Sequence, residues 1–469
     1  MPDRMRKRGG DFMRIEEATT ILHTVQAFDC CSIVGISNIG KSDLLRTLVL
    51  PDFLARFNPL AQRMLFVYVD CNRMLSLSDQ GFYELVLRCL QDQLRAKQAA
   101  SSAVAGASSR GVMEQLDHAD EGLINPHSPF HVPLSFNQGL TAVLDQLETA
   151  LVLIFDEFDD VLERVDGRVF LNLRALEDQY RRRLVYVTAT NLPLAMLRRD
   201  LDVDEFTELF AHSTYYLPPL NRSDATSFIQ NYAAGAGVTF NERDVAFLLD
   251  WAGGHIGLVE TACSVLGALT GARARDESQD WIIHREAASG MPRSLVVQTE
   301  CHKIWGSLND DEQQTLLDML TPGGEPSTPT IGSLRQKHVL VGNSDETLQP
   351  FCRLFASYLQ QQNTLARPGV HGLRVDVETG EVHVDGRRTE VLTNLEYRLL
   401  LLLYGQIGKI CDKYEVVEAV WGQDYIDTVD DARIEKLVSR LRAKIEPDPG
   451  TPRYILTIRG RGYKLVGPS

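Results

Sequence analysis

The sequence predicts an α/β domain with a parallel sheet and helices on both faces, followed by a helical region and two smaller units of helices and hairpins. Between residues 31 and 220, short apolar runs alternate with helical patterns. The runs are CSIVG (31–35), MLFVYVD (64–70), ALVLIFD (150–156) and RLVYVTATN (183–191). Buried parallel strands have this pattern because both faces of their sheet are covered. A chain of 469 residues is long enough for roughly three or four compact units.

Composition argues against a membrane-spanning or secreted protein. The chain is 44% hydrophobic and 24% charged, and no apolar run approaches the ~20 residues that span a bilayer. Residues 1–13 are basic but no apolar stretch follows them, which predicts a disordered basic tail and no secretory signal. The eight cysteines form no C-x-x-C pair and have no zinc-type spacing to histidine. We expect a cytoplasmic protein with reduced thiols and no membrane partner.

Charge is unevenly distributed along the chain. The net charge is −15, yet residues 432–464 contain nine Lys/Arg and three Asp/Glu, a balance of +6 that leaves −21 elsewhere. Contact with the phosphates of double-stranded DNA requires such a local basic patch. The sequence therefore places a candidate DNA-binding region in this segment.

The segment after the first apolar run has the spacing G-x-x-x-x-G-K-[ST]. Glycines let backbone N–H groups curl round phosphate oxygens, the lysine adds a charge near the β and γ phosphates, and the serine hydroxyl binds Mg²⁺. The helix that follows contributes its positive N-terminus. The motif thus predicts a site for ATP and Mg²⁺. Its cofactor-binding residues are Gly35, Ile36, Ser37, Asn38, Ile39, Gly40, Lys41, Ser42 and Asp43.

Polar residues end two of the other apolar runs. The third run leads into Asp156 and Glu157. A carboxylate at this end of a strand can hold Mg²⁺ beside the phosphate loop, and the next can orient or deprotonate the attacking water. We therefore expect Asp156 and Ser42 at the metal and Glu157 as a catalytic residue. Asn191 ends the fourth run, where it can contact the γ-phosphate or the water; a structural turn asparagine is the alternative.

The remaining segments divide the chain further. Residues 99–111 are rich in Ala, Ser and Gly, which predicts a flexible insertion. Helical patterns fill residues 221–290. Asn309 is followed three residues later by Glu312, a spacing that indicates the start of a helix with Asn309 as its N-cap. The residues after it have the pattern of helices and a hairpin. We expect a linker at residues 363–370.

Residues 14–290 resemble the STAND class of P-loop NTPases, which are related to AAA+ proteins. The family's phosphate loop, strand ending in Asp-Glu, sensor residue, helical lid and following winged helix occur here in the same order. The resemblance implies an NTPase core at 14–220, a lid at 221–290 and a middle winged helix at 291–362.

The same resemblance implies roles for residues outside the loop. The family's lid motif reads GGHP, whereas this chain has GGHIG at 253–257, with Ile256 where the proline is expected. His255 would contact the nucleotide there, with a helix-end histidine as the alternative. An arginine finger, a cation that stabilises the charge of the transition state, is implied at Arg198, with Arg199 as the other candidate.

The basic segment has the pattern of a DNA-contacting helix. Arg433, Lys436, Arg440 and Lys444 recur at steps of three and four residues and so share one face. An adjoining apolar stripe would pack on the domain. The stripe consists of Ile434, Leu437, Val438, Leu441 and Ile445. A solvated basic helix is the alternative.

Residues 371–469 resemble the winged-helix effector domain of OmpR/PhoB-type response regulators. The resemblance rests on the leading strands, on LTNLEYRLLLLL with Thr393 and Glu396 as a capping box, on VVEAVWG, on the helix VSRLRAKIEP and on the wing IRGRGYKLV. It implies that Arg440 approaches bases, whereas Lys436 contacts phosphates. The implied DNA-binding residues are Arg433, Lys436, Ser439, Arg440, Lys444, Arg459, Arg461 and Tyr463.

Two further expectations follow from this second resemblance. Leu437 stands where relatives often carry a polar residue that reads bases, so a base preference does not carry over. The acidic loop at 422–431 falls where the family's turn touches RNA polymerase, which makes the polymerase a candidate partner.

These features predict an ATP-binding transcriptional regulator in which nucleotide state, reset by hydrolysis, controls a C-terminal winged helix and the assembly of a homo-oligomer. Two alternatives remain. One is an ATPase that loads on or remodels DNA, as in replication or transposition. The other is a STAND-type sensor of defence or signalling whose output is protein association.

Overall fold

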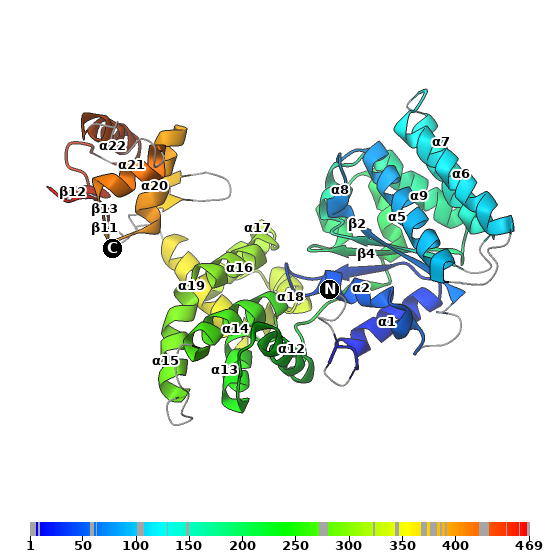
Figure 1. The fold of residues 1–469 in the computed structure, drawn as a ribbon, viewed down its shortest axis with the longest axis horizontal. Coiled ribbons are helices and arrows are strands. Elements are labelled where there is room, and N and C mark those ends of the chain that lie inside the picture. Colours follow the sequence, from blue (N-terminus) through cyan, green and yellow to red (C-terminus); the bar gives the residue numbers. More distant parts are fainter. Residues whose placement is uncertain are drawn as a thin grey trace. The chain divides into compact units, whose positions relative to one another are not determined.

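The computed structural model has two compact units, Met1–Leu359 and Gln360–Ser469, which are described separately. Figure 1 labels their helices and strands along the chain. The structure describes all residues except 1–5, 8–9, 57–60, 62, 101–106, 129, 147–149, 272–279, 322–323, 343–346, 367–372, 376–381, 385–386, 390–391, 422–430, 447, 459 and 467–469.

Five parallel strands form the centre of the first unit. Their order in the sheet is β2-β3-β4-β1-β5. The strands are β1 (Cys31–Val34), β2 (Leu65–Asp70), β3 (Leu151–Asp156), β4 (Leu184–Thr190) and β5 (Thr214–Tyr216). Both β3 and β4 are buried along their whole length, as expected where helices cover both faces. The four apolar runs supply β1 to β4, so the predicted fold class is confirmed.

Helices cover both faces of this sheet. In Figure 1, α5 (Asp79–Ala100) and α9 (Gly167–Gln179) lie over one face, and α1 (Ile15–Gln26) and α2 (Lys41–Leu48) over the other. Shorter helices join the strands. They are α3 (Pro51–Leu54), η2 (Cys71–Arg73), α8 (Asp159–Arg164), α10 (Leu194–Leu197), α11 (Leu201–Thr207) and η3 (Glu208–Phe210).

The register of the strands brings the candidate site residues to one edge of the sheet. Asp70 at the end of β2 pairs with Asp156 of β3, and Val34 of β1 pairs with Thr190 of β4. Because the carboxyl ends of parallel strands share one edge, the loop after β1, Asp156 and Asn191 meet there.

Two expectations for the first unit are corrected by the structure. The segment 99–111 is not a flexible insertion throughout, because α6 (Ala107–Ile124) begins within it and packs against α7 (His131–Gln146); residues 101–106 lie outside the described part. Nor are the described residues of the basic tail disordered. Phe12 and Met13 are each 1% exposed, and Lys7 pairs with the buried Asp224 at 2.7 Å.

Helices dominate the second half of this unit. The first four are α12 (Arg222–Ala236), α13 (Glu242–Ala252), α14 (Ile256–Gly271) and α15 (Asp280–Gly290). The next elements are η5 (Met291–Arg293), α16 (Leu295–Gly306), α17 (Asp310–Leu320), α18 (Thr328–Gln336), the two-stranded sheet of β6 (Leu340–Val341) and β7 (Gln349–Pro350), and α19 (Arg353–Ala366). Residues 363–366 of the expected linker are thus helical, and 367–370 are outside the described residues.

A buried ion pair holds the middle winged helix together. Asn309 caps α17 in a capping box with Glu312, as the sequence predicts. The carboxylate of Glu312 also accepts hydrogen bonds from Lys337 Nζ at 2.6 Å and Ser333 Oγ at 2.7 Å. The side chains of Glu312 and Lys337 are 1% and 0% exposed, and burial lowers the pKa of Lys337. Each charge is therefore tolerated only because the other is present.

The second unit is a winged helix with its own hydrophobic core. Strands β8 (Leu373–Val375), β9 (Val382–Val384) and β10 (Arg387–Arg388) form its leading sheet, and β11 (Ile410–Cys411), β12 (Ile455–Ile458) and β13 (Gly462–Leu465) form the wing sheet. Its helices are α20 (Asn394–Gly405), α21 (Lys413–Trp421) and α22 (Asp431–Ile445). The predicted capping box of Thr393 and Glu396 begins α20, and the predicted winged-helix fold of this unit is confirmed.

One carboxylate joins the end of α22 to the wing. Glu446 is 7% exposed. It accepts hydrogen bonds from the backbone N–H groups of Arg453, Tyr454 and Ile455, at 2.7 to 3.0 Å. The start of β12 is therefore fixed to the residue that follows the last turn of α22.

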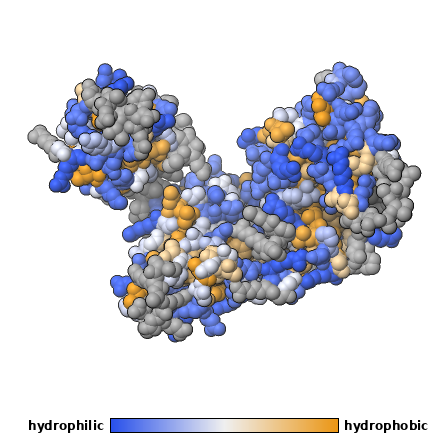
Figure 2. Space-filling model, viewed as in Figure 1, coloured by the Kyte–Doolittle hydropathy of each residue, from blue (hydrophilic) through white to orange (hydrophobic). Residues whose placement is uncertain are grey.

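The face of the molecule seen in Figure 2 is mainly polar. Figure 2 shows mostly hydrophilic residues on the visible face, with small separate apolar patches. Among the described residues, no helix combines the length and apolar character needed to cross a membrane. All eight cysteines are buried and unpaired.

Replacing Lys337 with alanine is expected to lower the free energy of unfolding by about 3–5 kcal/mol, because Glu312 would remain as an unpaired buried charge. Urea denaturation of the full chain measures the change. Arg164→Ala is the matched control, since the pair of Arg164 with Asp160 is 64% and 61% exposed, and exposed pairs contribute under about 1 kcal/mol. Equal losses for the two variants would contradict the assigned role of the buried pair.

Candidate functional site

The loop between β1 and α2 has the backbone geometry of an anion-binding loop. Asn38 and Gly40 have φ values of 55° and 105°, in the left-handed region. A Cβ atom at Gly40 would also clash with Ile256, so glycine alone fits there. Because α2 begins at Lys41, its first N–H groups point into the loop.

The ammonium of Lys41 lies at the centre of the site. The residue is 5% exposed, and Nζ donates to Gly35 O at 2.8 Å and to Asn191 Oδ1 at 2.9 Å. Burial lowers the pKa of Lys41, and the acidic residues Glu157, Asp159 and Asp156 oppose that shift. The loop carbonyls and these carboxylates together stabilise a charge that burial alone would disfavour.

The two carboxylates expected after β3 differ in their surroundings. Asp156 is 1% exposed; its carboxylate accepts hydrogen bonds from the hydroxyl of Tyr68 and from the backbone N–H of Glu157. Glu157 has a φ of 53°, a left-handed conformation that costs energy for a residue other than glycine. Burial raises the pKa of Glu157, whereas Lys41 opposes the rise. The strained backbone directs Glu157 into the pocket beside Lys41.

Asn191 lies where the sequence places it, and a further acid lies beside it. Its backbone N–H donates to Asp159 Oδ1 at 2.8 Å. Burial raises the pKa of Asp159, and its Oδ2 is buried without a hydrogen-bond partner. Sequence reasoning missed Asp159, whose only signal was its place in the acidic run after β3.

His255 joins the lid to the phosphate loop. Its Nδ1 accepts from the backbone N–H of Leu258 at 3.2 Å, and Nε2 lies 2.8 Å from Ser37 O. An accepting Nδ1 carries no proton, so the neutral ring donates Nε2–H to Ser37. Burial lowers the pKa of His255 to about 4. The histidine thus holds the loop from behind and is not among the residues that line the pocket; its contact with the nucleotide stays a prediction.

Arg14 is a second residue that sequence reasoning missed. It is 0% exposed, and its guanidinium donates to Ile39 O and Pro218 O, both at 2.8 Å. Glu17 lies 3.3 Å from the same group, and burial lowers the pKa of Arg14. Arg14 therefore supports the phosphate loop from the N-terminal segment. The available signal was a single arginine in FMRIEEA, with an acid three residues later.

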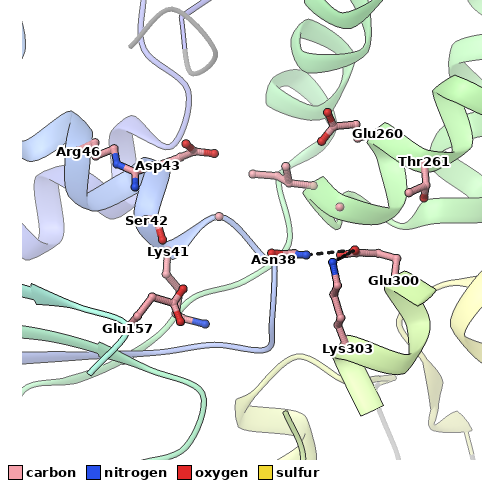
Figure 3. A pocket seen from close by; sticks show the side chains of 13 residues that line it. Asn38, Lys41, Ser42, Asp43, Arg46, Glu157, Glu260, Thr261, Glu300 and Lys303 are labelled. Carbon is pink, nitrogen blue, oxygen red and sulfur yellow. Dashed lines mark hydrogen bonds and ion pairs between the residues drawn. The ribbon is translucent and has the colours of Figure 1, made fainter. Parts of the chain in front are cut away.

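Helix α16 and Ser307, the residue that follows it, also reach the loop. Asn38 Nδ2 donates to Glu300 Oε2 at 3.1 Å, and Ser37 N–H donates to Ser307 Oγ at 3.2 Å. A pocket of about 380 Å³ lies between the loop, the lid and α16 (Figure 3). It is lined by Asn38, Gly40, Lys41, Ser42, Asp43, Arg46, Glu157, Ile256, Gly257, Glu260, Thr261, Glu300 and Lys303.

The two candidates for the arginine finger differ. Arg198 donates to Val165 O at 2.6 Å and Leu162 O at 3.3 Å, and it pairs with Asp200. These bonds hold Arg198 in its own subunit, which argues against its assignment as the finger. Arg199 is exposed, with Nε donating to Ala195 O at 3.0 Å.

The residues at the sheet edge fit a nucleotide with Mg²⁺. The loop, the helix N-terminus and Lys41 provide the donors that phosphates need. Within the described residues, no group of three or more His, Cys, Asp or Glu is arranged to hold a metal ion. Mg²⁺ often takes only one or two carboxylates and completes its shell with phosphate oxygens and water. Ser42 and Asp156, the predicted metal residues, are consistent with such a site.

In the second unit, α22 has the predicted division into two faces. Ile434, Leu437, Val438, Leu441 and Ile445 are buried. Arg433, Lys436, Ser439 and Arg440 are exposed. Since Leu437 is 6% exposed and belongs to the core, it packs the helix and is not available to read bases.

The other predicted DNA-binding residues differ in their exposure and in their partners. Lys444 Nζ donates to Glu396 Oε2 at 2.8 Å and holds α22 to α20, so its contact with DNA stays a prediction. Tyr463 is 4% exposed, so it supports the wing from within. Arg461 is exposed at the tip. Arg459 and residues 422–430 of the acidic loop lie outside the described residues.

The fold and the site define a P-loop NTPase whose chain continues into a winged-helix DNA-binding domain. The family model of Novel STAND NTPase 1 matches residues 11–352, and that of the transcriptional regulatory protein C-terminal domain matches residues 387–465. Because the first match covers more than half of the chain, the chain belongs to the novel STAND NTPase 1 family. Both predicted resemblances are thereby confirmed.

Individual proteins are similar to parts of the chain. Sensory transduction protein RegX3 of Mycobacterium bovis is 40% identical over 95 residues, 20% of this chain and 40% of the relative. The chain spans about two fifths of the length of such curated regulators. A Walker-type ATPase of Pyrococcus abyssi has a TM-score of 0.47 at 14% identity, over 76% of this chain and 97% of that chain. The RstA DNA-binding domain of Klebsiella pneumoniae, in complex with the RstA box, has a TM-score of 0.19 at 26% identity, over 21% of this chain and 94% of that chain.

Because of His255, the stability of the first unit is expected to fall as the pH decreases from about 6.5 to 4. Its pKa drops from an ordinary 6.5 to about 4 on folding. Between these pH values the unfolded chain binds a proton that the folded chain does not bind. The free energy of unfolding therefore falls by roughly 3 kcal/mol across this range. The measurement is the pH profile of unfolding for the wild type and for His255→Gln, which keeps an N–H donor but does not titrate. Parallel profiles would contradict this assignment.

Proposed function

We propose that the chain is an ATP-binding and ATP-hydrolysing transcriptional regulator in which bound nucleotide controls the C-terminal DNA-binding domain. One observation carries the proposal: the lid and the middle winged helix bond to the phosphate loop itself. His255 contacts Ser37 O, and Ser307 accepts from Ser37 N–H. Phosphates that bind the neighbouring N–H groups of this loop would bias the bonds of Ser37, so nucleotide state would have a direct effect on helices outside the core.

Nucleotide binding in this proposal depends on the loop and on two charges. The backbone N–H groups of residues 38–42 would hold the phosphates, and Lys41 would exchange its carbonyl partners for phosphate oxygens. Ser42 and Asp156 would hold Mg²⁺, which supplies charge neutralisation on the β and γ phosphates. The hydroxyl of Tyr68, bonded to Asp156, would fix the direction of that carboxylate.

Hydrolysis would depend on Glu157 and Asn191. A catalytic base works best with a pKa near the working pH, and burial raises the pKa of Glu157 toward that range. Asn191, held through its N–H by Asp159, would orient the attacking water through its side chain. Since Asn191 Oδ1 accepts from Lys41, the sensor and the phosphate-binding lysine are directly connected.

Other partners follow from exposed residues. Arg199 would act as the arginine finger on a neighbouring copy in a nucleotide-dependent homo-oligomer, because Arg198 is bonded within its own subunit. Arg433, Lys436, Ser439 and Arg440 present the DNA-contacting face of α22. RNA polymerase remains a proposed partner of the acidic loop at 422–431.

The nucleotide switch predicts different effects for two substitutions. Lys41→Ala is expected to abolish ATP binding, whereas Glu157→Gln should keep binding and slow hydrolysis by about 10²–10⁴-fold. The two variants should therefore shift DNA occupancy in opposite directions relative to wild type. Genome-wide DNA footprinting of the three proteins, with ATPase assays of each, measures both effects.

Three different outcomes separate the alternative functions. Sharp promoter sites that respond to both substitutions support a regulator. DNA-stimulated turnover with ATP-dependent filaments or rings would instead indicate a loading or remodelling ATPase. Activity that persists after deletion of residues 371–469 would indicate a sensor that signals by protein association.

Arg440 and Lys436 are expected to differ in what they contribute to DNA binding. Arg440→Ala should cost about 1–3 kcal/mol at the preferred site and reduce the discrimination between sequences. Lys436→Ala should weaken binding to all sequences similarly and lower the slope of log affinity against log salt by about 1. Fluorescence anisotropy titrations across salt concentrations test this difference. An equal loss of discrimination in both variants would contradict the assigned roles.

A further inference from the structure

Asp156, the proposed metal ligand, has a tyrosine beside it on the neighbouring strand. In the pairing of β2 with β3, Tyr68 lies opposite Ile154 and Asp70 lies opposite Asp156. Side chains two positions apart on a strand project from the same face of the sheet. Tyr68 therefore projects from the same face as Asp156, and its hydroxyl donates a hydrogen bond to Asp156 Oδ2.

Two donors fix the plane of the Asp156 carboxylate. The Tyr68 hydroxyl is bonded to Oδ2, and the backbone N–H of Glu157 donates to Oδ1 at 3.1 Å. Asp156 is 1% exposed, so water has little access with which to replace either donor. An ionised carboxylate has about four lone-pair sites, and each oxygen therefore keeps one for a metal ion or its water. The direction of these remaining sites is set by the two bonds.

A cation holds the ring of Tyr68 in turn. The guanidinium carbon of Arg46, in the last turn of α2, lies 5.2 Å from the centroid of the ring, within the range of an attractive cation–π contact. Arg46 Nη2 also lies 4.0 Å from Asp70 Oδ2. Arg46 lines the nucleotide pocket, where Figure 3 labels it. Contacts thus run from the helix of the phosphate loop through Tyr68 to Asp156.

The site has few other groups that could fix a metal ion. Within the residues that the structure describes, no group of three or more His, Cys, Asp or Glu is arranged to hold one. The predicted protein ligands are Ser42 and Asp156 alone, and Mg²⁺ requires a near-ideal octahedral arrangement of oxygens. The orientation of one carboxylate therefore has a large effect. Loss of a hydrogen bond to a ligating group typically lowers metal affinity by about 10–100-fold.

We propose that Arg46 and Tyr68 form a clamp that sets the affinity of this site for Mg²⁺ by orienting Asp156. The inference rests on the proposed nucleotide site and adds two positioning residues to it. Tyr68 donates the orienting hydrogen bond, and Arg46 holds the ring that carries the hydroxyl. Neither residue takes part in cleavage of the phosphate bond. The clamp acts on the part of nucleotide binding that depends on the metal.

Calorimetric titration of the full chain with a non-hydrolysable ATP analogue, in Mg²⁺ and in EDTA, tests the proposal. The ratio of the two affinities is the Mg²⁺ enhancement. Tyr68→Phe keeps the ring and removes the donor, so it is expected to lower the enhancement by at least about tenfold. Arg46→Lys keeps the charge but loses the planar group above the ring, and it should lower the enhancement by about two- to fivefold.

Two further variants separate this role from a contribution to folding. Tyr186→Phe is the matched control, because it removes another buried tyrosine hydroxyl of the same sheet, which donates to Leu173 O of α9 at 2.8 Å. It should change the enhancement by under about twofold. Tyr68→Phe introduced into Asp156→Asn should have no further effect, because the carboxylate that the hydroxyl orients is absent. Urea denaturation of each variant shows whether it is folded.

Each other outcome counts against the proposal. Equal weakening of binding by Tyr68→Phe in Mg²⁺ and in EDTA would assign Tyr68 to the shape of the pocket and overturn the inference. So would an enhancement that increases in Tyr68→Phe, an unchanged enhancement in Arg46→Lys, or an equal loss in Tyr186→Phe. If the wild type did not bind the analogue, the proposed function would fail together with the inference. A wild type that binds it equally well in Mg²⁺ and in EDTA removes the inference alone.

Discussion

The buried ammonium of Lys41 organises the acidic edge of the NTPase sheet. Lys41 is bonded to the carbonyls of its own loop and to Asn191. Three carboxylates gather at the same edge of the sheet, and the pKa values of two of them, Glu157 and Asp159, are raised by burial. Without the ammonium, so many acids at one buried edge would repel one another. The lysine therefore makes the acidic site possible before any nucleotide contributes to it.

The loop that carries this lysine is also the meeting point of distant segments. Arg14 reaches it from the N-terminal segment, His255 from the lid and Ser307 from the middle winged helix. Each of these uses a backbone group of the loop, so the loop cannot change its hydrogen bonds without affecting all three. Coupling between sites requires an element with two arrangements that both sites bias, and a loop shared in this way is a physical candidate for it.

Much of the fold follows from local patterns in the sequence. The apolar runs gave the strands, and the caps at Asn309 and Thr393 are set by residues only three positions apart. Such signals are local, so one chain suffices to find them. Periodicity also separated the faces of α22, although it did not show that Lys444 bonds to Glu396.

Partners that are far apart in the chain could not be found in this way. Asn38 and Glu300 are 262 positions apart, and no periodic pattern connects them. The basic tail was misjudged for a related reason: its charge indicated solvent, while Phe12 and Met13 anchor it in the core. Sequence patterns identify which residues are buried or exposed more readily than they identify what those residues touch.

The carboxylate of Glu446 has a consequence for control of the DNA-binding domain. It fixes the start of β12 to the end of α22 through three backbone N–H groups, so the helix and the wing form one rigid unit. In the regulator proposed above, such a unit would prefer the same bases in every nucleotide state. Control would then act on how many of these units are held together at one stretch of DNA, where effective concentration multiplies a fixed affinity.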